Sequence, residues 1–114
     1  MTRDEFDAAC RRLPGVTMDV QWGAAHVYKV GGRIFTVTDP ETTRFSLKVS
    51  DIAFEVLVET GRAIPAPYLA RAKWVRFEAL AVEDAAEMSD LVAHAHALVA
   101  AKLTRKLRAE LGIS

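Results

Sequence analysis

Basic and aromatic side chains alternate between Glu59 and Glu78, in a stretch that contains no acidic residue. Its cations and rings are Arg62, Tyr68, Arg71, Lys73, Trp74, Arg76 and Phe77. Cationic heads bind phosphate oxygens, and aromatic rings stack on the bases of nucleic acids. The stretch therefore predicts a nucleic-acid-binding surface, to which we assign Arg71, Lys73, Trp74 and Arg76.

Lys48 extends this surface if its strand lies beside the basic stretch. Phe45 and Leu47 alternate with Ser46 and Lys48, which places Lys48 on the wet face of a strand. A second interpretation remains open, in which the cations only form a solvated edge that discourages pairing with another sheet. Trp74 and Phe77 point to opposite faces of a strand, so at least one of them is expected in the core.

Other chemical groups do not assemble into a recognisable site. His94 and His96 are two apart on a helix, so their side chains diverge by about 200° and cannot share one metal ion. Glu83, Glu87 and Asp90 share a helix face, but acidic residues in the first turns of a helix also complement its dipole.

Catalytic motifs are absent from the sequence as well. It contains no Ser-centred nucleophile motif, no glycine-rich phosphate loop and no zinc-ligand spacing, and Cys10 has no His partner in a recognisable motif. Packing is the expected use of Cys10. We expect no enzymatic activity, no bound metal and no cofactor.

Composition limits the class of protein further. Lys plus Arg and Asp plus Glu number 15 each, so no long-range field of one sign acts on a partner. The single cysteine excludes an internal disulfide and favours a reducing compartment. The chain begins without an apolar export segment, and no apolar run reaches membrane-spanning length. These features predict a soluble, cytoplasmic protein without a membrane-bound part.

The local signals predict most elements of the first half of the chain. Thr2 and Glu5 have the spacing of a capping box for a first helix, which Pro14-Gly15 ends. Strands are expected over residues 16–21, 25–30 and 33–38, with Gly31-Gly32 as a hairpin turn, and residues 39–43 form a second turn before the strand of Phe45.

A second helix is expected after Ser50, which can cap it, and it ends at Gly61. Ile52, Val56 and Leu57 would form its buried stripe. Pro65 and Pro67 forbid a longer helix, and residues 73–78 are expected to form the last strand.

One long helix is expected from about residue 82 to residue 111. Its apolar stripe recurs at three and four residues: Met88, Leu91, Val92, Ala95, Leu98, Val99, Leu103 and Leu107. Acidic residues stand at its head, and Lys102, Arg105, Lys106 and Arg108 at its tail, which we assign to compensation of the helix dipole. The whole order predicts a single α+β domain over residues 1–114, with two layers: an antiparallel β-sheet and helices on one of its faces.

Several of these segments together resemble the MmcQ/YjbR family. They are Leu13-Pro14-Gly15, residues 30–35, Ser46-Leu47-Lys48, residues 66–74, and the pairs Leu91-Val92 and Leu98-Val99. The resemblance implies a CyaY-like, or frataxin-like, fold and a role in DNA binding. It carries over Lys48 and Trp74 as matched positions, with Arg71 and Lys73 just ahead of that Trp. The chain departs from the family at Ala95-His96, where Ser-Tyr is usual, and at Thr104, where Pro is usual.

The leading prediction is a non-enzymatic DNA-binding protein whose contacts are led by phosphates and depend weakly on base sequence. The first alternative is a domain that binds a small anionic metabolite, with Lys48 and Arg71 holding the anion in a cleft between the sheet and residues 65–72. The second alternative is a protein-interaction module.

Overall fold

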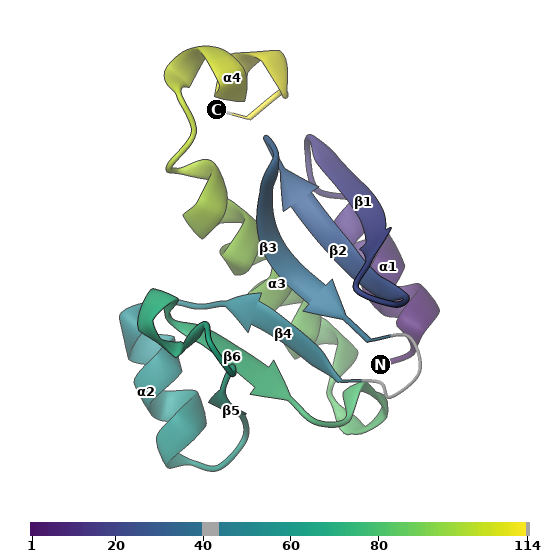
Figure 1. The fold of residues 1–114 in the computed structure, drawn as a ribbon, viewed down its shortest axis with the longest axis vertical. Helices are drawn as coiled ribbons and strands as arrows, with labels where there is room; N and C mark the ends of the chain where they lie inside the picture. Colours follow the sequence, from purple (N-terminus) through teal and green to yellow (C-terminus); the bar gives the residue numbers. More distant parts are fainter. Residues whose placement is uncertain (40–43, 114) are drawn as a thin grey trace.

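A six-stranded antiparallel sheet forms one layer of the protein in the computed structural model, which describes residues 1–39 and 44–113 (Figure 1). The strand order is β1-β2-β3-β4-β6-β5. The strands are β1 (Val16–Gln21), β2 (Ala25–Val30), β3 (Arg33–Thr38), β4 (Phe45–Lys48), β5 (Ile64–Pro65) and β6 (Trp74–Phe77).

Helices form the second layer, and the first and third of them lie behind the sheet in Figure 1. The helices are α1 (Arg3–Arg11), α2 (Asp51–Glu59), α3 (Ala85–Ala100) and α4 (Arg105–Glu110), with 3₁₀ turns η1 (Ala70–Ala72) and η2 (Leu80–Val82). Helix α3 packs on α1 and against β3 and β4, while α2 packs against β5 and β6. The predicted two-layer α+β architecture is confirmed. Among the described residues, no helix is long and apolar enough to span a membrane.

Side-chain caps fix the helix starts that the sequence indicated. Thr2 Oγ1 accepts from the Glu5 amide at 3.1 Å, and Glu5 Oε1 accepts from the Thr2 amide at 2.8 Å. The Ser50 side chain accepts from the amide of Ala53 at the start of α2, and Gly61 adopts a φ of 73° just after its end. These caps satisfy backbone groups that the helices leave without partners.

The core lies between the sheet and the helices. In β4, Phe45 and Leu47 are buried while Ser46 and Lys48 face away, as the alternation predicted. Phe45 stacks on Phe77 of β6 with ring centroids 4.9 Å apart. The register of β4 and β6 therefore places Lys48, Ser46 and Arg76 on the outer face of the sheet.

The predicted stripe of α2 is wrong at two of its three positions. Leu57 is buried, but Ile52 is 76% exposed and Val56 is 53% exposed. Helix α2 makes its main contacts with β5 and β6, and these strands have two and four residues. Strands this short can cover only one side of α2.

The predicted long C-terminal helix is also wrong, because the helix starts later than expected and is broken once. Helix α3 starts only at Ala85, after the 3₁₀ turn η2, with the Asp84 side chain as its cap. It ends at Ala100, and Thr104 begins α4 by accepting from the Leu107 amide at 3.1 Å. Between the two helices, Leu103 enters the core.

The start of the last strand differs from the prediction, and one predicted turn lies mostly outside the described residues. The last strand begins at Trp74 instead of residue 73, because Lys73 has a φ of 61° and closes η1 in the left-handed conformation. Residues 40–43 of the second predicted turn lie outside the described residues.

Candidate nucleic-acid interface

Lys48 and the basic stretch are neighbours, as the leading interpretation required. Lys48 is the last residue of β4 and lies opposite Trp74 of β6. Its Nζ donates a hydrogen bond to the carbonyl oxygen of Ala72 at 2.5 Å. Lys48 thus reaches η1, where Arg71 precedes the accepting residue.

Lys102 joins this end of the sheet, which the sequence did not predict. Burial lowers the pKa of Lys48, the charge of Lys102 lowers it further, and Asp51 at the start of α2 opposes both effects. This interaction requires the two ammonium groups to be near each other. Closely spaced like charges favour the binding of an anion.

Arg71 and Lys73, two further predicted cations, differ in their exposure and in their contacts. Arg71 is exposed and forms no ion pair with any described residue. Lys73 is half-buried, with its Nζ 4.9 Å from the ring centroid of Phe54, a cation–π contact. We call Lys48, Arg71, Lys73 and Lys102 the end cluster.

Trp74 does not offer the stacking face assigned to it. Its side chain is only 7% exposed, and Phe77 on the opposite face of β6 is fully buried. The backbone of Trp74 accepts from the Ala66 amide and donates to the Leu69 carbonyl, so residues 66–69 are bonded to it. Trp74 therefore belongs to the interior, and the expectation that at least one of the two rings is in the core is confirmed.

Arg76 shares the outer face of the sheet with Lys48, but its head points elsewhere. Its Nη2 lies 3.0 Å from Glu78 Oε1, and Arg44 Nε lies 3.1 Å from the second oxygen of the same carboxylate. Both arginines line a hollow that also includes Trp22. The structure therefore brings Lys48, Arg71 and Lys73 to one end and sets Arg76 apart.

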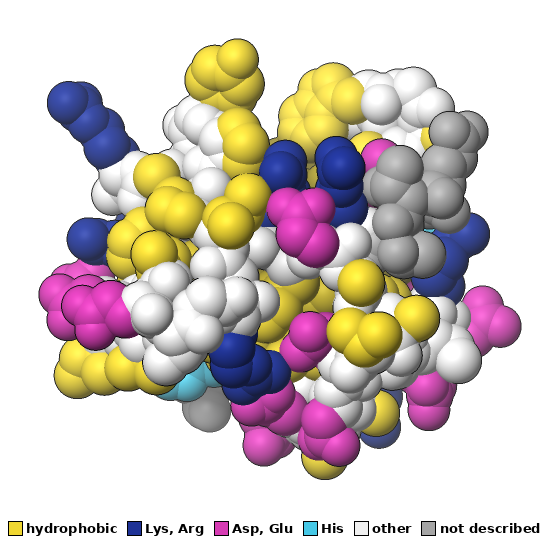
Figure 2. Space-filling view, turned by 90° about the horizontal axis from the view of Figure 1, so that it is seen from below, with side chains coloured by type: hydrophobic (Ala, Val, Ile, Leu, Met, Phe, Trp, Pro, Cys, Tyr) yellow, Lys and Arg dark blue, Asp and Glu magenta, His cyan; other side chains and the backbone are white. Residues whose placement is uncertain are grey.

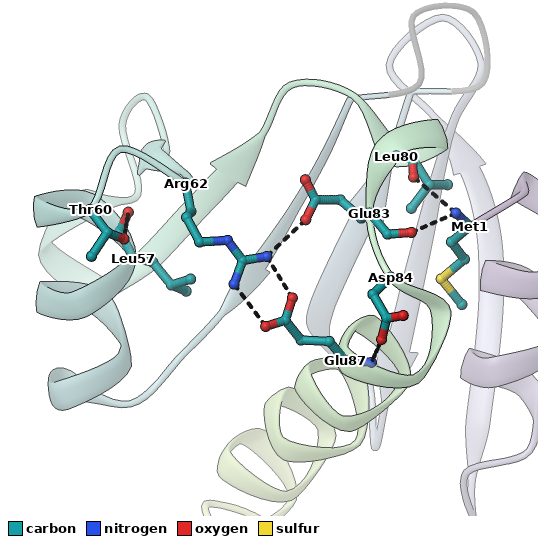
Figure 3. Close-up of polar contacts among 8 residues, drawn as sticks. All are labelled: Met1, Leu57, Thr60, Arg62, Leu80, Glu83, Asp84 and Glu87. Carbon is teal, nitrogen blue, oxygen red and sulfur yellow. Dashed lines mark hydrogen bonds and ion pairs between the residues drawn. The ribbon is translucent and has the colours of Figure 1, made fainter.

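Arg62, the first cation of the acid-free stretch, is bound to acidic residues of the helical layer (Figure 3). Its Nη1 donates to Glu87 Oε2 at 2.7 Å, and its Nη2 donates to Glu83 Oε1 at 3.0 Å. The hydrogen bond from Arg62 is the main cause that lowers the pKa of Glu87. A guanidinium thus occupies the acidic face considered for a cation. No group of three or more His, Cys, Asp or Glu among the described residues could hold a metal.

The two histidines have separate surroundings, as their divergence on the helix predicted. His96 is buried, its Nε2 lies 2.8 Å from the carbonyl oxygen of Pro14, and its ring meets Phe35 edge-on. His94 is exposed in a groove between α2 and α3. Cys10 is buried as well, and burial raises its pKa, which suits packing.

The C-terminal cations do not serve the dipole of α3, in contrast to the prediction. Helix α3 has no basic residue in its last turn, and Lys102 lies beyond its end. Arg105 and Lys106 belong to α4 and are exposed. The break at residues 101–104 places Lys102 beyond the end of α3, where its charge acts on Lys48.

Charges of both signs alternate on the surface in Figure 2, where Lys and Arg side chains stand beside Asp and Glu side chains. The view shows no continuous basic block on this face. Such a distribution fits a formal net charge of zero. Any attraction of an anionic partner therefore depends on local groups such as the end cluster.

The described residues form a small α+β protein with a cluster of cations at one end of its sheet. The model of the YjbR family matches residues 11–98, so the chain belongs to the YjbR family. The chain is also similar to the crystal structure of Deinococcus radiodurans protein DR2400, a DUF419 domain, with 27% identity and a TM-score of 0.86. That match covers 99% of this chain and 89% of the other. No curated protein matches the sequence.

Proposed function

We propose that this protein binds DNA through phosphate contacts of the end cluster, with weak dependence on base sequence and without catalysis. One observation carries the proposal: the hydrogen bond from Lys48 Nζ to the carbonyl oxygen of Ala72 brings this cation beside the exposed Arg71. The charge of Lys102 also lowers the pKa of Lys48. Repulsion between the two ammonium groups is relieved when a phosphate lies between them. The family resemblance supports the same partner.

The affinity of this surface is expected to be modest. Asp51 lies close enough to Lys48 to oppose the pKa shift, and the chain as a whole carries no net charge. Four cations that each neutralise a phosphate release about 0.9 counterion apiece, which predicts a log–log salt slope of about −3 to −4.

The test is the salt dependence of duplex binding, measured by fluorescence anisotropy with two unrelated labelled duplexes. Lys102→Ser should weaken binding to both duplexes alike and reduce the slope by about one unit, because one phosphate contact is lost. Arg3→Ser is the matched control, since Arg3 is an exposed cation in α1, whose start lies at the opposite end of the molecule from the α3–α4 link (Figure 1).

Two results would reject this function. One is the absence of duplex binding by the wild type at low salt. The other is an equal loss of affinity in the Lys102→Ser and Arg3→Ser variants, which would show only a general effect of charge.

The metabolite-binding alternative finds less support in its original form. It placed the anion in a cleft between the sheet and residues 65–72, but Ala66 is 2% exposed and Trp74 is 7% exposed. The Ala66 amide donates to the Trp74 carbonyl, so this segment closes on β6. Lys48 and Arg71 would therefore meet a small anion only at the surface of the end cluster, where a phosphate of DNA meets them too.

A further inference from the structure

The hollow around Arg76 lies on the outer face of the sheet, away from the helices. It measures about 360 Å³, within the size range of ligand pockets. Val37, Ser46 and Arg76 lie across from one another on β3, β4 and β6 and line it, together with Trp22 and Arg44. Asp39 also lines the hollow.

A strained turn presents Trp22 at this hollow. Trp22, Gly23 and Ala24 have φ angles of 49°, 78° and 127°, a run of positive values that costs free energy in the two residues with side chains. The Trp22 side chain is nevertheless 69% exposed. The turn therefore holds a large flat ring in solvent, where it gains little from the protein's own packing.

Arg44 and Arg76 supply charge beside this ring. Glu78 bonds both guanidinium groups, with Nε of Arg44 at 3.1 Å and Nη2 of Arg76 at 3.0 Å from its two oxygens. One carboxylate thus positions two cations, and these three groups together carry a charge of about +1, which the carboxylate of Asp39 in the lining offsets. Each guanidinium has five N–H donors, so donors remain for a phosphate, which arginine binds in a forked geometry.

We propose that this hollow binds a nucleotide unit, with its base stacked on Trp22 and its phosphate on Arg44 and Arg76. A free nucleotide and an unpaired residue of a single-stranded nucleic acid share this chemistry. A base inside a duplex does not, because both of its faces are already stacked. The inference goes beyond the proposed duplex contacts and depends on none of the residues of the end cluster.

The experiment compares two probes at low salt. One is a fluorescein-labelled deoxythymidine decamer followed by anisotropy, and the other is AMP followed by quenching of intrinsic Trp fluorescence. We expect Trp22→Leu to weaken decamer binding at least about fivefold, since stacking contributes about 1–3 kcal/mol per base. Arg44→Gln should weaken it and reduce the salt slope by about 0.7, the value for one phosphate of a single strand.

Tyr68→Leu is the matched control. Tyr68 is a fully exposed aromatic residue with a φ of 67°, like Trp22 in a left-handed conformation, but it does not line the hollow. Its replacement should leave AMP binding unchanged and should weaken decamer binding less than Trp22→Leu does. Because all three substituted side chains are exposed, their variants should fold, and an unchanged far-UV circular dichroism melting curve checks this.

The outcomes distinguish a single strand from a free nucleotide as the ligand, and they test this hollow separately from the proposed duplex site. Binding of the decamer alone identifies a single strand as the ligand, and binding of AMP as well identifies a free nucleotide. If neither probe binds, or if Trp22→Leu retains the wild-type affinity, the inference is wrong whatever the duplex assay gives. Lys102→Ser tests the duplex function separately, because it should leave decamer binding at the hollow intact.

Discussion

Arg62 and Trp22 show that the use of a single residue depends on its neighbours in space. Arg62 begins the acid-free stretch, yet it is bound to Glu83 and Glu87 of a later segment. Trp74 lies among cations in the sequence and is buried. Trp22 was not among the predicted binding residues, and it is exposed. The sequence predicted the residue types of a binding surface, but exposure is decided by tertiary packing. The only local signal for Trp22 was its place before a glycine at a strand end.

The ion pairs of Arg62 with Glu83 and Glu87 are expected to stabilise the fold. The hydrogen bond from Arg62 holds the pKa of Glu87 below its usual value, so this interaction stabilises the fold above the unfolded-state pKa. The stabilisation is lost as the pH falls through the lowered pKa. Arg62→Gln should therefore raise the pKa of Glu87, as seen by NMR titration, and reduce the free energy of unfolding at pH 7 by up to about 1 kcal/mol.

The same substitution should have almost no effect near pH 2, where the carboxylates of both states are protonated. Arg105→Gln is the control, because Arg105 is exposed and forms no ion pair with a described residue. An equal loss of stability at both pH values would mean that Arg62 acts through packing of its aliphatic part instead of its charge.

Elements were predictable where local chemistry specifies them. The Thr2 capping box, the Gly31-Gly32 hairpin and the alternation of β4 each appear in the structure as the sequence indicated. The stripe of α2 was not predictable, because the area that β5 and β6 offer is a property of the assembled sheet. The break after α3 was missed for a different reason, since an apolar periodicity of three and four residues continues across it.

Thr104 provides the test of this break. In a continuous helix, Thr104→Ala would be neutral or stabilising, because alanine is the better helix former. As the N-cap of α4, Thr104 accepts from the Leu107 amide, and its loss should lower the free energy of unfolding by about 0.5–2 kcal/mol. Urea denaturation measures the difference. Thr104→Ser keeps the accepting hydroxyl and should retain the wild-type stability, and a stabilised Thr104→Ala variant would contradict the break.

At the scale of the whole molecule, contacts between segments far apart in the sequence hold the two layers together. The N-terminal amino group of Met1 donates to the carbonyl oxygen of Glu83 at 2.7 Å, which joins the start of the chain to the turn before α3 (Figure 3). At the other end, the β2–β3 hairpin meets the α3–α4 link through Gly31 and Leu103. The sequence predicted the two layers but not these contacts, because residues that pair across layers leave no mark on local periodicity.

Replacing Gly31 by alanine tests whether its contact with Leu103 holds the α3–α4 link in place. Its φ is 58°, and a Cβ there would lie 2.7 and 2.8 Å from the two methyl carbons of Leu103, which is buried in the core. Gly32 has a φ of 79° with nothing within 4 Å of such an atom. Gly32→Ala should cost only the left-handed strain of about 1–2 kcal/mol. Gly31→Ala should cost about 1–3 kcal/mol more, because Leu103 must also move.

The larger effect of Gly31→Ala should extend to binding if the end cluster is the DNA site. Displacing Leu103 also displaces Lys102, its neighbour in the link, from Lys48, so duplex affinity should fall more in Gly31→Ala than in Gly32→Ala under conditions where both are folded. Urea denaturation and duplex anisotropy on the same preparations measure the two effects. Equal stability of the two variants would show that Gly31 and Leu103 are not in close contact. A stability difference without an affinity difference would instead separate the packing of the two layers from the binding surface.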